Sequence, residues 1–294
     1  MSVTIVTVLH DSAPELAQLL RSVRDQLAAD TQLVAVDSGS RDDGPALAKA
    51  AGAEVIVLGA NLGFGAASNA GVARARHDVT VLLNPDCELR DAGLADLAAR
   101  AAGFDALLVP RLIEADGALQ RSAHPLPGRP AALVRAVLPT RALPQVHRAR
   151  RPRRVGWAIA ACLAAPTALL RRLGPFDPEA FLFYEDMDLC LRAHAAGVPT
   201  ILHPEVVVRH LGGRSTARAF GGEAFELQAR RRREVVGARL GPRALQIDDG
   251  AQALTFGLRA AVGRERGRNL AALHALRAAR RMATAARRHA QPDD

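Results

Sequence analysis

The sequence predicts an α/β fold, a doubly wound and mostly parallel sheet with a C-terminal helical extension. Within residues 3–83, apolar strand-like runs alternate four times with helix-forming segments, and short loops join them. This alternation is typical of right-handed βαβ units, whose strands lie parallel in one sheet. From Phe220 onward the composition becomes helical and rich in arginine. We therefore expect two domains, residues 1–216 and residues 217–294.

The first part of the chain supplies the parallel strands. Strands are expected at Val3–Leu9, Gln32–Val36, Glu54–Leu58 and Val79–Leu83, with helices between them that end near Ala29, Ala51 and Arg76. Ser12 and Glu15 form a capping-box pattern at the start of the first helix. We expect Ser12 to cap that helix, because its side-chain oxygen can accept N–H groups that lack a partner in the first turn.

The rest of the chain is less regular. The expected elements are a strand at Ala106–Pro110, a hairpin turn at Glu114–Gly117, a long mobile loop at His124–Arg154, a strand pair within Val155–Ala165, strands at Thr200–Leu202 and Val206–Arg209, and helices at Glu223–Leu240 and Gln252–Arg288. The long loop is expected because proline and arginine recur in it without a period.

The balance of charge narrows the class of partner. The formal net charge is +9, and 38 of the 39 basic residues are arginine, since Lys49 is the only lysine. Such a chain calls for an acidic partner, and a nucleotide, a lipid phosphate or an anionic membrane surface would serve. Aromatic residues are nearly absent from the basic clusters, so no nucleic-acid partner is expected.

The cysteines and the apolar stretches predict a cytoplasmic protein. The three cysteines, Cys87, Cys162 and Cys190, form no C-x-x-C pair and lie among apolar residues, as reduced buried thiols do. Residues 1–11 lack a basic signal-peptide segment, and the longest apolar stretch, Val155–Leu170, is short for a membrane span. The basic C-terminal helices either pack on the first domain or lie on anionic lipid at the inner face of the cell membrane.

Polar side chains follow the predicted strands at one edge of the sheet. Asp37 follows the second strand, a glycine-rich helix start surrounds Gly65, and Asn84-Pro85-Asp86 follows the fourth strand. Ligands of such sheets bind at the carboxyl ends of the strands. The cluster suits a nucleotide diphosphate with Mg²⁺ or Mn²⁺: Asp37 would accept a base N–H, the helix start would face phosphate, and Asp86 would hold the metal.

The stretch from Phe176 to Arg192 brings carboxylates to one point. Phe181–Tyr184 form an apolar approach, after which Glu185, Asp186 and Asp188 open a helix. Asp188 and Arg192 are spaced for an i,i+4 pair. An ordinary acidic helix start would look the same in isolation. A general base beside a partly apolar wall is the functional interpretation.

The chain resembles bacterial family 2 glycosyltransferases, in the rhamnosyltransferase-like branch. The matching segments occur in family order over residues 2–216; they are VTIVTVLHDS, VDSGSRDDG, NLGFGAASNAG, LLNPDCEL, VPRLIEADGALQRS, GPFDPEAFLFYEDMDLCLRAHAAG and HLGGRS. The resemblance implies a GT-A fold, a nucleotide-sugar donor, a divalent metal and inversion at the anomeric carbon. It implies dTDP-rhamnose as the first choice of donor, with UDP-hexoses, UDP-galactofuranose or GDP-sugars behind it. The implied acceptor is a lipid-linked or cell-surface glycan, hence a role in cell-wall or polysaccharide biosynthesis.

The resemblance also implies roles for individual residues. Asp186 matches the catalytic base, and His210 joins Asp86 at the metal. The donor-binding positions are Asp37, Asn61, Gly63, Phe64, Gly65, Asn69, Asn84 and Asp86, while Trp157 and Glu185 lie on the acceptor side. His10-Asp11 stands where the family usually has Tyr-Asn, and Ala160-Ala161 stands where Gly-Ala is usual.

Two other functions are compatible with parts of the pattern. A nucleotide-binding oxidoreductase would use a similar sheet, but the segment Gly63–Ser68 lacks the third glycine and follows the third strand instead of the first. A catalytically inactive transferase homologue would keep the fold, although retention of Asp86 and Asp186 argues against it.

Overall fold

The computed structural model describes residues 2–138, 143–178, 180–212, 224–263 and 265–289. The chain divides into two compact units: residues 1–125 with 146–219, here called the sheet unit, and residues 126–145 with 220–294, here called the helical unit. The expected domain boundary after residue 216 lies outside the described residues. Residues 126–145, which the sequence placed in the first domain, group with the C-terminal helices.

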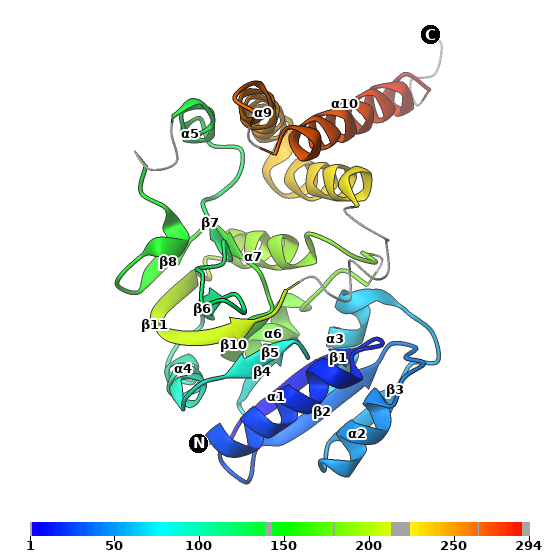
Figure 1. Ribbon diagram of the computed structural model, residues 1–294, viewed down its shortest axis with the longest axis vertical. Coiled ribbons are helices and arrows are strands. Elements are labelled where there is room, and N and C mark those ends of the chain that lie inside the picture. The colour runs from blue at the N-terminus through cyan, green and yellow to red at the C-terminus, as the bar shows by residue number, and fades with distance from the viewer. Residues whose placement is uncertain (1, 139–142, 179, 213–223, 264, 290–294) are drawn as a thin grey trace. The chain divides into compact units, whose positions relative to one another are not determined.

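A nine-stranded sheet forms the centre of the sheet unit (Figure 1). Its strands are β1 (Thr4–Leu9), β2 (Gln32–Asp37), β3 (Glu54–Val57), β4 (Val79–Leu83), β5 (Cys87–Leu89), β6 (Leu107–Ile113), β8 (Arg153–Val155), β10 (Cys162–Pro166) and β11 (Thr200–His210). The order is β3-β2-β1-β4-β10-β6-β11-β5, with β8 beside β11. The four strands expected first are parallel neighbours, and β10, β5 and β8 run antiparallel to their partners. The carboxyl ends of β1, β2, β4 and β11 therefore share one edge.

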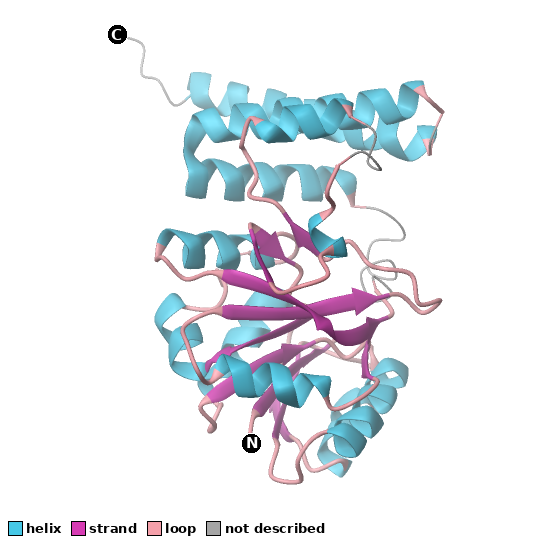
Figure 2. Ribbon diagram, turned by 90° about the vertical axis from the view of Figure 1, so that its left-hand side faces the viewer, coloured by secondary structure: helices cyan, strands magenta, loops and turns pink. Residues whose placement is uncertain are grey.

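Helices cover both faces of this sheet (Figure 2). They are α1 (Ala13–Gln26), α2 (Gly44–Ala50), α3 (Gly63–Ala73), α4 (Gly93–Ala101), α6 (Thr167–Leu173) and α7 (Glu185–Ala195). Strand side chains alternate between faces. Accordingly, Ile5 of β1 joins a core with Leu16 of α1, whereas Val6 lies against Gly71 of α3, where an added Cβ would overlap the Val6 side chain.

The first helix is capped from outside its own sequence. Ser12 makes no side-chain cap bond, so the expected capping box is wrong. Instead, Oδ2 of Asp42 accepts the Ala13 N–H at 2.7 Å, and Oδ1 accepts the Gly44 N–H at 3.0 Å. One carboxylate thus accepts hydrogen bonds at the N-terminal ends of two helices that meet at the carboxyl edge. The helix dipole favours a negative charge at such ends.

Several elements differ from the sequence expectation. The structure adds β5, α4 and α6, and β11 is one strand with a register shift between His203 and Val207 in place of two short strands. The segment expected as a long loop contains α5 (Ala131–Val137) and a short 3-10 helix, η2 (Val146–Arg148). A second small sheet joins β7 (Ala123–His124) to β9 (Trp157–Ala158).

The helical unit consists of α5, α9 (Phe225–Ala261) and α10 (Arg266–His289). Helix α9 is interrupted at Gly241, whose φ is +83°, and Pro242 follows. Two arginine–aspartate pairs sixteen residues apart, Arg232–Asp248 and Arg233–Asp249, hold its halves side by side. No helix within the described ranges is long and apolar enough to cross a membrane.

Candidate active site

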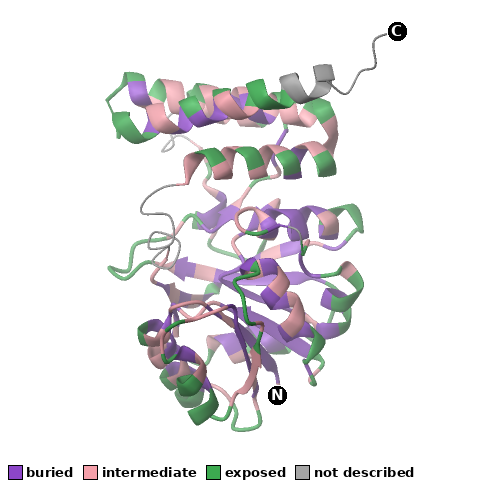
Figure 3. Ribbon diagram, turned by 90° about the vertical axis from the view of Figure 1, so that its right-hand side faces the viewer, coloured by how far each residue is buried: buried purple, intermediate pink, exposed green. Residues whose placement is uncertain are grey.

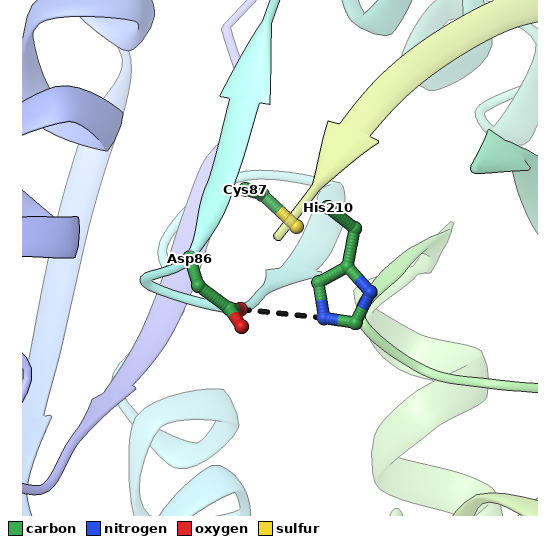
Figure 4. Close-up of side chains that lie close together, drawn as sticks. All are labelled: Asp86, Cys87 and His210. Carbon is green, nitrogen blue, oxygen red and sulfur yellow. Dashed lines mark ion pairs between the residues drawn. The ribbon is translucent and has the colours of Figure 1, made fainter. Parts of the chain in front are cut away.

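Asp86 and His210 meet at the carboxyl edge of the sheet. Asp86 lies in the turn after β4 and His210 ends β11, which pairs with β5 so that His210 lies opposite Cys87. The Leu211 N–H donates to the Asp86 carbonyl at 3.0 Å and closes the corner. Oδ1 of Asp86 lies 3.3 Å from Nε2 of His210, with both side chains largely buried (Figure 4).

The hydrogen bonds of His210 show what this pair can hold. Nδ1 lies 2.9 Å from Oε1 of Gln120, and an amide oxygen only accepts, so Nδ1 carries the proton. In the neutral ring Nε2 is then a lone-pair acceptor facing a carboxylate oxygen. Either a proton on Nε2, which would make an ion pair with Asp86, or a metal cation between the two atoms would join them. The Asp86–His210 pair therefore fits a divalent cation, with Gln120 orienting the imidazole.

Cys87 completes the only group of three metal-ligating residue types that the described part of the chain brings together. Burial raises the pKa of its thiol well above the usual value. Sγ instead donates to the Ala161 carbonyl at 3.3 Å. A neutral thiol is a poor ligand for a hard cation, so the oxygen and nitrogen of Asp86 and His210 remain the ligand candidates.

Asp186 lies in the first turn of α7, behind an unusual backbone turn. Phe183 and Tyr184 have φ values of +72° and +63°. Two successive non-glycine residues in this region are strained and need support from their surroundings. Asp188 pairs with Arg192 at 2.7 Å as expected, and Arg192 also donates to the Gly174 and Pro175 carbonyls. The helix is thereby tied to the segment that leads into it.

Ala160 and Ala161 connect the carboxylate of Asp186 to the Asp86 turn. The backbone of Ala160 hydrogen-bonds to the Asp186 carboxylate. The carbonyl of the next residue, Ala161, accepts the Asn84 N–H at 2.8 Å and the Cys87 thiol. Adjacent peptide groups thus bind both the candidate base and the turn that carries the candidate metal ligand.

The pKa of Asp186 is raised from 3.8 to about 6. Burial is the main cause, and backbone hydrogen bonds from Met187 and Ala160 offset part of the rise. Burial and the helix N-terminus act in opposite directions on this group, and here burial is the stronger. A carboxylate that titrates near physiological pH is matched to general-base work.

Aromatic rings form a wall beside the start of α7. Trp157 stacks on His124 with ring centroids 4.1 Å apart, and Tyr184 meets Trp157 edge-on at 6.1 Å. The pairing of β7 with β9 brings His124 and Trp157 together. Glu185, which the resemblance places on the acceptor side, is buried as the first residue of α7, whereas Asp186 is half-buried. Of the two neighbours, Asp186 is the less buried residue as a whole, although its carboxyl group is enclosed enough for burial to raise its pKa.

Asp37 and Asn61 lie where β2 and β3 lead into their loops. Asp37 is buried, and its Oδ1 accepts the Ser40 N–H at 2.9 Å. Oδ1 of Asn61 accepts the Gly63 N–H at 3.0 Å, and Nδ2 reaches Nε2 of His10 at 3.2 Å. His10, which stands where the family usually has Tyr, thus takes part in the hydrogen bonds of the loop around Asn61.

The glycine-rich start of α3 packs against the segment that leads to α7. A Cβ on Gly63 would overlap the Phe181 carbonyl, and one on Gly65 would lie 3.0 Å from Cβ of Phe176. The rings of Phe64 and Phe176 meet edge-on at 5.4 Å. The glycines therefore allow close contact between two chain segments, a role that the sequence reasoning did not assign to them.

The structure gathers most of the predicted residues into two groups, whereas Asp37, Asn61, Trp157 and Glu185 belong to neither. Asn84, Asp86 and His210 form one corner, which Ala160–Ala161 links to Asp186, and the buried Oδ1 of Asn84 has no hydrogen-bond partner among the described residues. Gly63, Phe64, Gly65 and Asn69 form the contact with Phe176–Phe181. No role for Gln120 was predicted from the sequence, although this residue lies in one of the segments that match the family. Its backbone N–H donates to the Leu112 carbonyl, so the predicted hairpin could have placed it beside β6.

Comparisons with known proteins identify relatives of this chain. Residues 4–126 match the profile of glycosyl transferase family 2. The N-acetylglucosaminyl-diphospho-decaprenol L-rhamnosyltransferase of Mycobacterium tuberculosis is 28% identical over 238 residues, which are 73% of this chain and 77% of that protein.

Solved structures share the fold. The mannosyltransferase PcManGT from Pyrobaculum calidifontis, in complex with GDP-Man and Mn²⁺, has a TM-score of 0.57 and 16% identity, covering 97% of this chain and 75% of that one. GalNAc-T7 with UDP, GalNAc and Mn²⁺ has a TM-score of 0.57 and 16% identity, over 71% of this chain and 43% of that one. At these identities the likeness concerns the fold alone.

The fold is that of glycosyltransferases with a GT-A fold, which confirms the predicted fold class. More particularly, residues 4–126 match glycosyl transferase family 2, and the chain is similar to a rhamnosyltransferase over most of its length. The class of enzyme expected from the sequence is thereby confirmed, and it replaces the oxidoreductase alternative.

Proposed function

We propose that this glycosyltransferase moves L-rhamnose from dTDP-rhamnose to a hydroxyl group of a lipid-linked glycan, with inversion at the anomeric carbon. The similarity to a rhamnosyltransferase whose name specifies a polyprenyl diphosphate acceptor supports the choice of sugar and acceptor. The match of residues 4–126 to family 2 supports a nucleotide-sugar donor.

The observation that carries the proposal is the link through Ala160 and Ala161. These neighbours hold the Asp186 carboxylate on one side and the turn of Asp86 on the other. An inverting transferase needs its base and its diphosphate-binding corner on opposite sides of one reacting carbon. The short connection through two residues would place the base and the diphosphate-binding corner on either side of one reacting carbon.

The residues then have distinct tasks. Asp186 takes the proton from the acceptor hydroxyl, and the oxygen attacks the anomeric carbon as its bond to the diphosphate breaks. Asp86 and His210 would hold a divalent metal, Mg²⁺ or Mn²⁺, whose positive charge would stabilise the leaving diphosphate. The wall of His124, Trp157 and Tyr184 packs beside Asp186 and offers apolar surface to the acceptor sugar. No covalent enzyme intermediate is needed.

The donor-binding residues and the lipid-linked acceptor indicate where on the protein, and where in the cell, transfer would occur. Asp37 and Asn61 lie at the carboxyl edge and are proposed to hold the nucleoside end of the donor. A lipid-linked acceptor is confined to a bilayer, so the enzyme would act peripherally at the inner face of the cell membrane.

Transfer assays test the proposal directly. The full chain is given dTDP-rhamnose, UDP-hexoses, UDP-galactofuranose or GDP-mannose, each with Mn²⁺ and a polyprenyl-diphosphate GlcNAc acceptor. We expect transfer from dTDP-rhamnose, with an inverted anomeric centre in the product by NMR. Transfer from another donor only would refute the choice of sugar. Absence of transfer from every donor, together with no thermal shift on adding any nucleotide diphosphate, would leave an inactive homologue.

A further inference from the structure

The net positive charge of the chain lies in one of its two units. The helical unit contains 18 arginines and 8 acidic residues, a net charge of +10. The sheet unit contains 21 basic and 22 acidic residues, a net charge of −1. The net positive charge of the chain therefore comes from the helical unit.

Two acidic side chains of the helical unit are buried within it. Asp248 and Asp249 are buried and paired with Arg232 and Arg233. Among the described residues of this unit the exposed arginines are Arg129, Arg230, Arg239, Arg243, Arg266, Arg268, Arg277, Arg280 and Arg281, and the exposed acids are Glu226, Glu234 and Glu265. The outer surface is thus more strongly basic than the composition alone indicates.

An apolar face is exposed on the same unit. Leu254, Leu258 and Val262 follow one another at intervals of four residues in and just after the second half of α9, and 41%, 43% and 78% of their surfaces are exposed. Residues four apart lie on one side of a helix. Exposed positions recur along the ribbons of this unit (Figure 3).

The apolar stripe of α10, formed by Leu270, Leu273, Leu276 and Met282, does not provide this surface. Leu273 and Leu276 are buried where α10 packs along α9. Only Met282 of that stripe is strongly exposed. The amphipathic pattern of α10 thus stabilises the helical unit internally, while α9 and α5, with exposed Val134 and Val137, keep apolar side chains outside.

We propose that the helical unit docks on an anionic lipid bilayer, with Leu254, Leu258 and Val262 inserted below the headgroups. A bilayer offers both chemistries found here, since acidic headgroups attract arginine and the acyl region takes apolar side chains. A nucleic acid would bind the arginines but leave three apolar side chains in water. This surface serves the proposed function by bringing the enzyme to a lipid-linked acceptor, but vesicle binding is measured without sugars and is judged independently of transfer.

Vesicle cosedimentation of the full chain tests the docking surface. Vesicles of phosphatidylcholine alone are compared with vesicles containing phosphatidylglycerol, at low and high salt. We expect binding only with phosphatidylglycerol and weakening as salt screens the charges. Leu254→Ser with Leu258→Ser and Val262→Ser should weaken binding about tenfold or more. Val57→Ser with Phe104→Ser, which removes exposed apolar side chains from the sheet unit, is the matched control and should bind as wild type.

A spectroscopic probe separates insertion from simple attraction. The native cysteines are buried, so Leu258→Cys offers one accessible thiol for an environment-sensitive dye. Its emission should shift to the blue with phosphatidylglycerol vesicles and stay unchanged with heparin, a polyanion without acyl chains. Lack of vesicle binding at low salt overturns the proposal. So does binding that the serine variant leaves unchanged, or a dye response equal for heparin and vesicles.

Discussion

Both ends of the Asn69 side-chain amide hydrogen-bond to the backbone of Phe176. Nδ2 donates to the Phe176 carbonyl at 2.8 Å, and Oδ1 accepts the Phe176 N–H at 3.0 Å, across 107 residues of sequence. Asn69 lies in α3, the helix assigned to the donor, and Phe176 opens the segment that ends at Asp186. The amide therefore fixes the donor-side helix relative to the chain that presents the base.

Asn69→Ala removes both hydrogen bonds and leaves backbone groups of Phe176 without them. We expect a loss of roughly 1–3 kcal/mol in the free energy of unfolding, because unsatisfied polar groups are costly. The turnover number should fall more than donor affinity, since the base is displaced while the nucleoside site remains. Urea unfolding and steady-state kinetics measure the two effects. Ala73→Ser, at an exposed position of the same helix, is the control. Unchanged turnover in a destabilised variant would show that the amide serves folding alone.

Gly63 and Gly59 form a matched pair for testing the contact at the start of α3. Both have positive φ, +85° and +73°, but only Gly63 has backbone atoms where a Cβ would go, those of Phe181. Gly59→Ala should cost about 1 kcal/mol of strain. Gly63→Ala should cost clearly more and should also reduce transfer, because Phe181 precedes α7 by a few residues. Thermal denaturation and transfer assays of both variants make the comparison. Equal effects of the two substitutions would contradict the role given to this contact.

Gln120 is predicted to set the metal affinity of a site it does not touch directly. Gln120→Leu removes the acceptor for the Nδ1–H of His210, so the imidazole loses its orientation. Loss of such support typically weakens metal binding about 10- to 100-fold. Titration of Mn²⁺ in the presence of nucleotide diphosphate should show the weaker metal binding of Gln120→Leu. Asp86→Ala should instead abolish Mn²⁺-dependent donor binding, and its circular dichroism spectrum should show an intact fold. Glu114→Gln, exposed in the neighbouring hairpin, should behave as wild type. Wild-type Mn²⁺ affinity in Gln120→Leu would remove His210 from the ligand set.

The raised pKa of Asp186 predicts the pH dependence of transfer. Below about pH 6 the carboxyl group is protonated and cannot accept the hydroxyl proton. The ratio kcat/KM should therefore rise about tenfold per pH unit up to about 6 and then level off. Asp186→Asn should bind donor normally and lose transfer by about two orders of magnitude or more. Glu185→Gln should act more mildly, through acceptor KM. If Asp186→Asn transferred sugar at a near-normal rate and Glu185→Gln did not, Glu185 would be the catalytic base in place of Asp186.

The same pKa predicts an effect on stability. The folded value, about 6, lies above the unfolded 3.8, so the folded state holds a proton that the unfolded state has lost between these pH values. Stability must fall as pH rises through this window, by up to about 3 kcal/mol above pH 6. Asp186→Asn carries no charge and escapes this loss. Its stability relative to wild type should be higher at pH 7 than at pH 4 in urea unfolding. A difference independent of pH would contradict the raised pKa.

The parallel core and the order of the site segments could be predicted from the sequence. The strand at Val79–Leu83 has the expected bounds, Asp37 ends β2, and Asp86 lies in the turn after β4, as the runs of β-branched residues and the turn formers indicate. These features depend on local preference and on side-chain period, which are properties of a few neighbouring residues. The family resemblance was likewise carried by short segments in a fixed order.

Only the tertiary structure decided which distant groups meet. Asp42 replaces Ser12 as the helix cap, Gln120 orients His210, and the start of α3 packs against the chain before α7. The rise in the Asp186 pKa comes from burial, and the apolar face of α9 is exposed because α10 uses its own stripe for packing. Desolvation and contact between remote segments depend on the surroundings of a residue in space, which neighbouring sequence does not specify.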